Sequence, residues 1–252
     1  LNRGCKKIIL GIGGSATTDG GTGMARALGY RFLGSLGQEL PQGGGSLKDL
    51  TFIDDRGVDP RLKELSLFAA CDVDNPLYGP TGAACIYGPQ KGATAKDVAL
   101  LDAGLQRLGE VCREQYGTDR SPVPGAGAAG GLGFGLIIFA GAALRPGVEL
   151  ILDACQFDDI IKDADWIITG EGRCDSQTLR GKVPLGVAKR ADRVGVPVAL
   201  IAGGIEGDPS QIGMCAWRSL TGEGVSVTDA MEHAEELTKA AAAELVKELF
   251  AR

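Results

Sequence analysis

The sequence predicts an α/β protein in two parts, with a parallel sheet in the C-terminal part and a more irregular part before it. Three observations support this fold class. From about residue 148 onward, short apolar runs alternate with helix-like patterns, as expected of a parallel sheet. Glycine-rich clusters follow the apolar runs, where a loop must turn. The first 145 residues mix strands, helices and glycine-bearing loops, so we expect a second, α+β-like domain that faces the sheet across a cleft.

The composition limits the classes of function. The 252 residues suffice for one large or two small domains, and 40 of them are glycine, about twice the usual frequency, without any repeat. The net charge is −6 and no long basic run occurs, so a general nucleic-acid binder is not expected. The longest apolar stretch, 128–144, is interrupted by glycines and is short for a membrane span, which predicts a buried, glycine-packed helix. No signal peptide is recognised.

The cysteine and histidine content points away from several kinds of catalytic site. The seven cysteines are odd in number and form no C-x-x-C pair, which indicates buried, reduced thiols in a cytoplasmic protein. Cys174 lies in a polar loop and is the thiol that we expect to be exposed. His233 is the only histidine, so a Ser-His-Asp hydrolase, a Cys-His protease and a histidine-bound zinc site are excluded.

The first predicted strand is Lys6–Leu10, and a helix is expected from about Thr22 to Leu28. Between them lies the glycine-rich segment 11–21, which lacks the G-K-[ST] ending of a P-loop and the G-x-G-x-x-G spacing of a dinucleotide fold. It combines close backbone approach with hydroxyls and one carboxylate. Both a structural turn and an oxyanion-binding loop explain this composition. The candidate binding residues are Gly13, Gly14, Ser15, Thr17 and Asp19.

Two further segments of the N-terminal part carry candidate residues. A strand at Leu67–Ala70 ends in a turn in which Asp72 is either a turn former or a magnesium ligand, since its carboxylate suits both uses. Lys91 lies between two glycines, just before a helix whose capping box is predicted at Thr94–Asp97. It is either a solvated surface lysine or a phosphate contact.

The stretch 165–189 is the strongest functional candidate. An apolar run, Trp166–Ile168, predicts a buried parallel strand that stops at a glycine-flanked turn at 169–173, and Pro184 suits the start of a helix. A strand, a polar glycine-bearing loop and a helix N-terminus form a phosphate or carboxylate site in open α/β sheets, because free N–H groups and the helix dipole attract anions. An ordinary βα connection is the alternative. The side chains that favour a site are Glu171, Arg173, Asp175, Ser176, Gln177, Thr178 and Lys182.

The last part of the chain predicts a strand and a long helix. Val196–Ala202 is expected to be a buried strand that ends at a pair of glycines. The segment Thr228–Phe250 predicts one surface helix, with His233 exposed on it. The residues expected to face inward from this helix are Met231, Ala234, Leu237, Ala241, Leu245 and Leu249.

Four segments, taken together and in this order, resemble the class I glycerate kinases. They are G-I-G-G-S-A-T-T-D-G-G at 11–21, C-D-V-D-N-P-L at 71–77, G-P-Q-K-G-A at 88–93, and T-G-E-G-R-C-D-S-Q-T with a following G-K at 169–182. The resemblance implies ATP-dependent phosphorylation of D-glycerate, usually at the 2-hydroxyl, with Mg²⁺ and in the cytoplasm. It also implies a Rossmann-like α/β domain and a second α/β domain across a cleft, which we place at 148–252 and 1–147.

The resemblance also implies that this chain holds only the C-terminal part of the Rossmann-like domain, because family members begin with a further segment. Two alternatives to the kinase stay open. A nucleotide-cofactor oxidoreductase would use the same type of sheet, but its glycine fingerprint is absent. A non-catalytic fragment or sugar-acid-binding module would bind glycerate without forming ADP.

Phosphoryl transfer asks a protein for positioning and charge compensation, and this requirement suggests roles for the candidates. Arg173, Lys182 and Lys91 are expected to neutralise the glycerate carboxylate or the transferred phosphoryl group, with Arg173 the better carboxylate clamp. A carboxylate is expected to hold Mg²⁺ or to orient the substrate hydroxyl, and the candidates for this role are Asp72, Asp175 and Glu171. The catalytic candidates are Arg173, Asp175, Lys182 and Asp72, and the metal candidates are Asp72 and Asp175.

The remaining expectations concern binding. Ser15, Thr17 and Asp19 are candidates for hydroxyl and phosphate contacts. The predicted partners are D-glycerate and a nucleotide, ATP, with neither a nucleic acid nor a membrane among them. A homodimer is left open.

Overall fold

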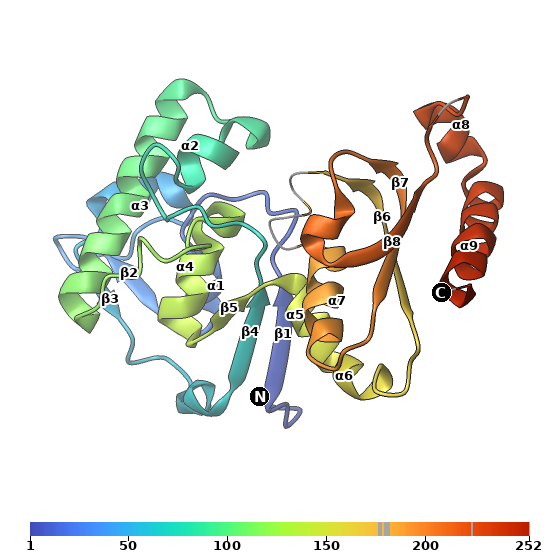
Figure 1. Cartoon of the computed structure of the whole chain (residues 1–252). Helices are drawn as coiled ribbons and strands as arrows, with labels where there is room; N and C mark the ends of the chain where they lie inside the picture. Colours follow the sequence, from blue (N-terminus) through green and yellow to red (C-terminus); the bar gives the residue numbers. More distant parts are fainter. Residues whose placement is uncertain (176–177, 179–181, 223, 252) are drawn as a thin grey trace. The chain divides into compact units, whose positions relative to one another are not determined.

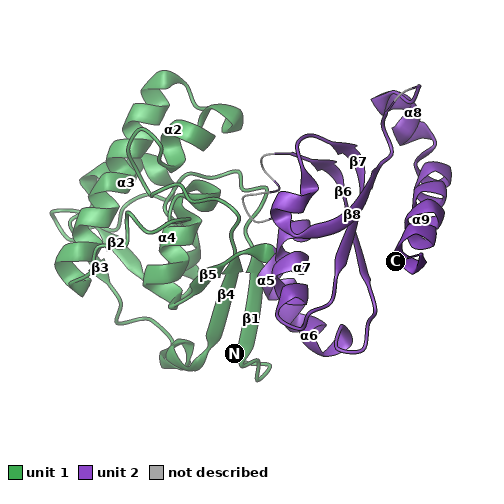
Figure 2. Ribbon diagram, viewed as in Figure 1, with its two compact units in different colours: residues 1–147 green, residues 148–252 purple. Residues whose placement is uncertain are grey.

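The chain divides into two compact units in the computed structural model, unit 1 at Leu1–Gly147 and unit 2 at Val148–Arg252 (Figure 2). Both units contain parallel strands connected through helices (Figure 1), so the predicted α/β fold class is confirmed. Within the described part of the chain, no helix combines the length and the apolar composition that a bilayer span needs. The structure describes residues 1–175, 178, 182–222 and 224–251.

Unit 1 is organised around a parallel sheet with the strand order β1-β4-β5. Its strands are β1 (Lys7–Gly11), β4 (Ser66–Ala70) and β5 (Ala143–Arg145). β1 and β4 pair along their whole length, so they end side by side at Gly11 and Ala70. The sequence predicts both of these strands. It does not predict β5, because Ala143 and Leu144 belong to the apolar stretch 128–144 that was assigned to a buried helix.

The helices of unit 1 pack around a core that includes the fully buried rings of Phe32 and Phe134. They are α1 (Thr22–Ala27), α2 (Ala83–Tyr87), α3 (Ala95–Tyr116) and α4 (Ala128–Ala140), with 3₁₀ helices η1 (Gly44–Asp49), η2 (Pro60–Glu64) and η3 (Pro89–Lys91). The predicted capping box starts α3: Thr94 N donates to Asp97 Oδ2 at 2.9 Å, and Asp97 N donates to Thr94 Oγ1 at 3.3 Å.

The predicted buried, glycine-packed helix is α4, whose first turn has left-handed φ values at Ala129, Gly130 and Gly131. Gly20 N donates to Gly130 O at 3.0 Å. A Cβ atom added to Gly130 would lie 1.9 Å from Thr17 O, so only glycine lets α4 approach the loop after β1 this closely. The start of α4 therefore supports the loop that carries the first group of candidate residues.

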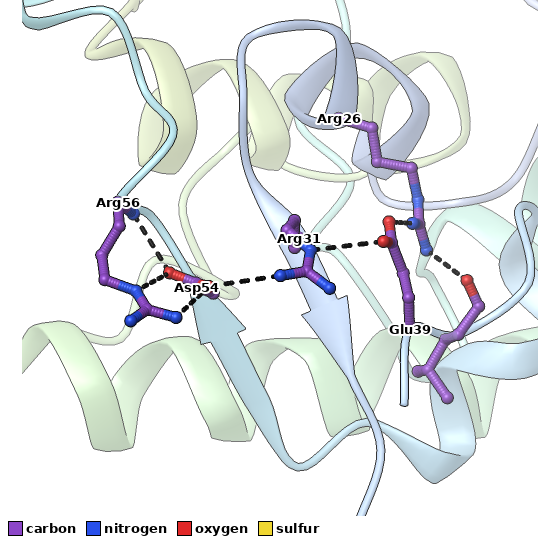
Figure 3. A network of polar contacts seen from close by, with 6 residues as sticks. Arg26, Arg31, Glu39, Asp54 and Arg56 are labelled. Carbon is purple, nitrogen blue, oxygen red and sulfur yellow. Dashed lines mark hydrogen bonds and ion pairs between the residues drawn. The ribbon is translucent and has the colours of Figure 1, made fainter. Parts of the chain in front are cut away.

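A second, antiparallel sheet in unit 1 pairs β2 (Arg31–Leu33) with β3 (Phe52–Asp54). An ion-pair network lies along it (Figure 3). Glu39 pairs with Arg26 at 2.5 Å and Arg31 at 3.3 Å, and Asp54 pairs with Arg56 at 2.8 Å. The hydrogen bonds from Arg56 hold the pKa of Asp54 well below its usual range. Because arginine pairs with both carboxylates, we assign the network to holding this sheet together.

Unit 2 contains a parallel sheet with the strand order β6-β7-β8, as the alternation of strands and helices predicts. The turn predicted at 169–173 is wrong, because β6 continues through it and pairs with β7 as far as Cys174 and Ile205. Glycines allow this extension: a Cβ atom on Gly203 would lie 2.5 Å from Gly172 O. The strands are β6 (Ile167–Cys174), β7 (Val198–Ile205) and β8 (Met214–Ser219).

The single helix predicted at Thr228–Phe250 is also wrong, because the segment forms two helices that separate at His233. Ser226 starts the first of them with a capping box to Asp229. Ala241, Leu245 and Leu249 are buried as predicted, whereas Met231 is 76% exposed. The helices are α5 (Gly147–Ala154), α6 (Phe157–Ile160), α7 (Val183–Asp192), α8 (Val227–Glu232) and α9 (Ala234–Phe250), with the 3₁₀ helix η5 (Pro209–Ile212).

A buried arginine joins three helices of unit 2. Arg190 of α7 donates to Glu149 of α5 at 2.6 Å and to Asp158 of α6 at 2.9 Å, and it also pairs with Asp153 of α5. These carboxylates raise the pKa of Arg190 above its already high ordinary value. Helical periodicity did not predict this inward position, since basic residues are rarely buried unless they are paired.

Candidate functional site

The carboxyl ends of β1 and β4 border a cavity of about 320 Å³ in unit 1. Ligands of parallel α/β sheets bind beyond the carboxyl ends of the strands. Gly13, Gly14, Ser15, Asp72 and Lys91 all line this cavity, although they come from segments far apart in the sequence. The other lining residues are Ile12, Ala70, Cys71, Val73, Tyr87, Gln90, Ala128 and Ala129.

Lys91 is half-buried and its ammonium group is held by neutral oxygens. Lys91 Nζ donates to Ser15 Oγ at 2.8 Å and to Thr17 O at 2.6 Å. Burial lowers the pKa of Lys91, an effect that nearby Asp19 opposes. These contacts tie the ammonium group of Lys91 to the loop after β1, and its side chain lines the cavity. The phosphate contact stays a prediction.

The glycine-rich loop after β1 contributes backbone and one hydroxyl to the cavity. Gly14 has a φ of 72°, and an added Cβ atom on Gly13 would meet no atom within 4 Å. Asp19 is not among the lining residues. Its Oδ1 accepts from Gly21 N at 3.1 Å and its Oδ2 accepts from Gly23 N at 2.9 Å, so its carboxylate satisfies the start of α1.

The loop after β4 presents Asp72 to the cavity. The residue is exposed, and its Oδ1 accepts from Gly147 N at 2.9 Å. Tyr87 and Gln90 line the same cavity and were missed in the sequence. Tyr87 donates to Asn75 Oδ1 at 2.6 Å, and burial raises the pKa of its hydroxyl. No periodicity or motif pairs Tyr87 with Asn75, so the sequence carried no signal for this contact.

In unit 2, a second group of candidates lies at the carboxyl end of β6. Thr178 is fully buried; its hydroxyl donates to Glu171 Oε1 at 2.7 Å and accepts from Asp175 N at 3.1 Å. The first bond holds the carboxylate of Glu171, and the second holds the hydroxyl of Thr178. Two further candidates, Ser176 and Gln177, lie outside the described residues.

The two cations of this group share one carboxylate. Lys182 Nζ lies 3.8 Å from Asp175 Oδ1, and Arg173 Nε lies 3.9 Å from Asp175 Oδ2. Arg173 also pairs with Glu206. Lys182 is the N-cap residue of α7, with Pro184 in the first turn of that helix. The charges of Arg173 and Lys182 are thus compensated in part by carboxylates within 4.0 Å, whereas the direct contacts of Lys91 are with neutral oxygens.

The thiol predicted to be exposed, Cys174, is buried, with 4% of its surface exposed. The reason is the extension of β6, which carries Cys174 into the core of unit 2. Burial raises its pKa, so the thiol is not activated as a nucleophile. Cys5 and Cys155 are the exposed cysteines.

A cavity of about 600 Å³ lies beyond the carboxyl ends of β6, β7 and β8 in unit 2. Glu171 and Arg173 line it together with residues of α8 for which no role in a site was predicted. The apolar character of these residues was visible in the sequence, but the prediction of one long helix placed Met231 on its inward face. The lining residues are Glu171, Gly172, Arg173, Gly203, Gly204, Ile205, Glu206, Leu220, Thr221, Val227, Ala230, Met231 and Ala234.

A sequence profile of the glycerate kinase family matches residues 1–250. The chain is 50% identical over 245 residues to a glycerate kinase of Halalkalibacterium halodurans, covering 96% of this chain and 64% of the relative. It is 49% identical over 208 residues to a glycerate 2-kinase of Escherichia coli, covering 82% of this chain and 55% of the relative. A crystal structure of a protein named glycerate kinase 2 from Salmonella typhimurium LT2 matches with a TM-score of 0.81 and 42% identity, covering 98% of this chain and 66% of that chain.

The chain therefore belongs to the glycerate kinase family, as the four motifs indicate. It spans 64% of the length of the first of these relatives and 55% of the second. The family assignment applies to the chain over residues 1–250.

Proposed function

We propose that the protein to which this chain belongs transfers a phosphoryl group from ATP to D-glycerate and forms 2-phosphoglycerate. The observation that carries the proposal is the family match over residues 1–250. The cation at the carboxyl ends of β1 and β4 supports it, because phosphoryl transfer depends on positioned charge more than on covalent chemistry.

In unit 1, we assign Lys91 to the glycerate carboxylate or to the transferred phosphoryl group. A half-buried ammonium group held by Ser15 and Thr17 has lost part of its hydration, and an anion in the cavity restores favourable interactions. The open space beside Gly13 lets such an anion approach the backbone.

In unit 2, we assign Arg173 and Lys182 to the same overall task, with a smaller effect per residue. Their contacts with Glu206 and Asp175 compensate part of their charge before any substrate arrives. Glu171, which accepts a hydrogen bond from Thr178, is the carboxylate of unit 2 that we assign to a hydroxyl group of a bound substrate. This part-buried hydrogen bond holds the carboxylate, which is what a positioned acceptor requires.

The residues fit a magnesium ion that binds mainly through the nucleotide. In the part of the chain that the structure describes, no three His, Cys, Asp or Glu side chains are grouped to hold a metal. Mg²⁺ in kinases needs only one or two carboxylates besides phosphate oxygens and water. Of the two predicted ligands, we favour Asp72, because Asp175 already lies beside Lys182 and Arg173. The bound ion would neutralise phosphate charge.

The test is glycerate-dependent ADP release by the purified 252-residue chain with Mg²⁺-ATP and D-glycerate. Reactions without glycerate give the background, and a full-length relative such as the glycerate kinase of Bacillus subtilis serves as the positive control. A higher melting temperature with D-glycerate and no ADP would support the alternative, a non-catalytic sugar-acid-binding module. If the complete parent protein also forms no ADP under conditions in which the control is active, the kinase proposal is wrong.

The position of phosphorylation is tested with two simpler acids. D-Lactate keeps the carboxylate and the 2-hydroxyl but lacks the 3-hydroxyl, and 3-hydroxypropionate has the reverse pattern. We expect ADP release with D-lactate only, and ³¹P NMR of the D-glycerate product should show 2-phosphoglycerate. The opposite preference would move the reaction to the 3-hydroxyl.

We further propose that the enzyme works in the cytoplasm. The seven cysteines form no disulfide among the described residues, which suits a reducing compartment. The homodimer stays a prediction, and sedimentation of the chain at several concentrations tests it.

A further inference from the structure

The cavity in unit 2 has an apolar wall formed by α8 and the first residue of α9. Val227, Ala230 and Met231 of α8 follow the spacing i, i+3, i+4 and line the cavity together with Ala234, which begins α9. Val227 is 68% exposed and Met231 is 76% exposed, although both side chains are apolar. Helix α8, which carries three of these residues, packs near the end of β7 (Figure 1). Exposed apolar side chains around a concave surface are typical of ligand sites.

Glycine backbone at the ends of β6 and β7 also lines the cavity, at Gly172, Gly203 and Gly204. An added Cβ atom on Gly172 would meet no atom within 4 Å, so the space beside its backbone is open. This backbone and the thioether of Met231, a polarisable group that packs well against aromatic rings, both line the cavity and are available to a flat ring bound in it.

The charges in the cavity argue against glycerate or a phosphate chain as its main occupant. Glu171 and Glu206 contribute two carboxylates, and Arg173 contributes one guanidinium that already pairs with Glu206. An excess of negative charge repels an anion. Carboxylates at the ends of parallel strands instead suit ribose hydroxyls, which donate hydrogen bonds to them.

We infer that this cavity binds the nucleoside part of ATP, with the adenine against α8 and the glycine backbone and the ribose near Glu206 and Glu171. The inference rests on the proposed function, because it names where the phosphoryl donor is held. A cavity of about 600 Å³ is within the range of pockets for ligands of nucleotide size and is larger than a three-carbon acid needs. Arg173 then lies at the end of the site that leads to the phosphates.

Binding of ADP, adenosine and tripolyphosphate to the wild-type chain, measured by calorimetry, tests the inference. We expect adenosine to compete with ADP and tripolyphosphate to compete poorly. Gly172→Val places a side chain in the open space, and we expect at least roughly tenfold weaker ADP binding. Met231→Gln keeps the length of the side chain and removes its apolar character, and we expect about threefold weaker binding. Because Met231 is exposed, this second variant folds even if Gly172→Val does not.

The controls are Phe250→Gln and Gly13→Val. Phe250 is 77% exposed and does not line the cavity, so its substitution should leave ADP and adenosine binding unchanged. Gly13→Val fills open space in the unit 1 cavity and should leave adenosine binding unchanged. Wild-type ADP affinity in both Gly172→Val and Met231→Gln would overturn the inference, as would the absence of ADP binding by the wild type.

The kinase proposal and the nucleoside site fail in different ways. Glycerate-dependent ADP release with an unchanged KM for ATP in both unit 2 variants would refute the site and keep the kinase. Weakened ADP binding in both variants would support the site, even if D-glycerate were not the acceptor.

Discussion

The parallel sheets of unit 1 and unit 2 end in cavities of opposite chemistry. The cavity of unit 1, of about 320 Å³, is lined by a loop of small residues and by Lys91. Ser15 and Thr17 accept hydrogen bonds from the ammonium group of Lys91. Unit 2 surrounds about 600 Å³ with an apolar helical face and an excess of carboxylate. Both cavities lie at the carboxyl ends of parallel strands. The side chains beyond the strands therefore decide which part of a substrate each sheet can bind.

Glycine serves the two cavities in different ways. In unit 1, Gly130 lets α4 approach the loop after β1, and this contact supports the residues around Lys91. In unit 2, Gly203 lets β6 and β7 stay paired to their ends, which lengthens the strands up to the cavity. A glycine-rich sequence thus indicates close backbone approach, but it does not say whether a turn or a strand results.

Removing the charge of Lys91 should have the largest effect on activity. It tests most directly whether the two cavities bind different parts of the substrates. Lys91→Met keeps much of the aliphatic stem and removes the ammonium group. We expect kcat/KM for D-glycerate to fall roughly a hundredfold, because a positioned cation opposite developing charge contributes on that scale. Adenosine binding should not change. Initial rates of ADP release at saturating Mg²⁺-ATP measure the first effect, and calorimetry measures the second.

Lys96→Met is the matched control, since Lys96 is exposed in the first turn of α3 and does not line the cavity. Its kcat/KM should equal that of the wild type. Equal values for the two variants would show that the cation of unit 1 has no part in the reaction, and the proposed division of labour would be lost.

Removing Arg190 should weaken unit 2 and leave unit 1 intact. In Arg190→Leu, the carboxylates of Glu149, Asp153 and Asp158 lose their common partner and repel one another. We expect the free energy of unfolding to fall by about 2–3 kcal/mol. This loss lies at or below the lower end of the values for breaking a buried ion pair, because the three carboxylates are partly exposed. Urea unfolding gives the size, and hydrogen exchange resolved along the chain shows where it acts.

The neighbouring Lys189→Leu is the control, because Lys189 lies on the exposed side of α7. Faster exchange confined to unit 2 in Arg190→Leu is the expected pattern. Equal acceleration in unit 1 would mean that the two compact units do not unfold separately.

A pair of matched substitutions compares the two cavities directly. Gly13 and Gly172 both lie outside the left-handed φ region, and a Cβ atom added to either would meet no atom within 4 Å, so both positions suit a substitution by valine. We expect Gly13→Val to raise the KM for D-glycerate roughly tenfold and Gly172→Val to raise the KM for ATP by a similar factor. Steady-state kinetics with each substrate varied in turn measure both. An exchange of the two effects would reverse the assignment of the cavities.

Features that depend on neighbouring residues could be predicted from the sequence. The capping box of Thr94 and Asp97, the strand at Lys7–Gly11 and the parallel order of unit 2 all follow from local patterns. The motif residues that line the unit 1 cavity could also be named in advance, because loops after parallel strands meet at one edge of a sheet.

Features that depend on distant partners could not be predicted. Lys91 contacts Ser15, which is 76 positions away, and no local pattern around Lys91 could predict this contact. The extension of β6 through Thr169–Arg173 depends on the glycines of β7. The inward position of Arg190 depends on carboxylates of two other helices. In each case the deciding group lies outside the window in which periodicity or turn preference acts.

The smallest expected effect is on the alkaline side of the pH profile of kcat/KM. It tests the protonation state of Lys91. Burial lowers the pKa of Lys91, so the free enzyme should lose its ammonium proton at a lower pH than an ordinary lysine does. We expect kcat/KM for D-glycerate to decline in that range. Bound glycerate favours the charged form and raises the pKa again, so kcat should decline only at higher pH. In Lys91→Arg, which stays charged, the decline in kcat/KM should disappear.

Stability should show the opposite sign from activity in the same pH range. Because the pKa of Lys91 is lower in the folded state, the unfolded chain binds more protons between the folded and the unfolded pKa values. The free energy of unfolding therefore gains a contribution from Lys91 as pH rises through this window, and Lys91→Met should not show that gain. If the wild type loses activity and gains free energy of unfolding over the same pH interval, both changes can be assigned to the ammonium group of Lys91. A decline in kcat/KM that persists in Lys91→Arg would assign the alkaline limb to another group.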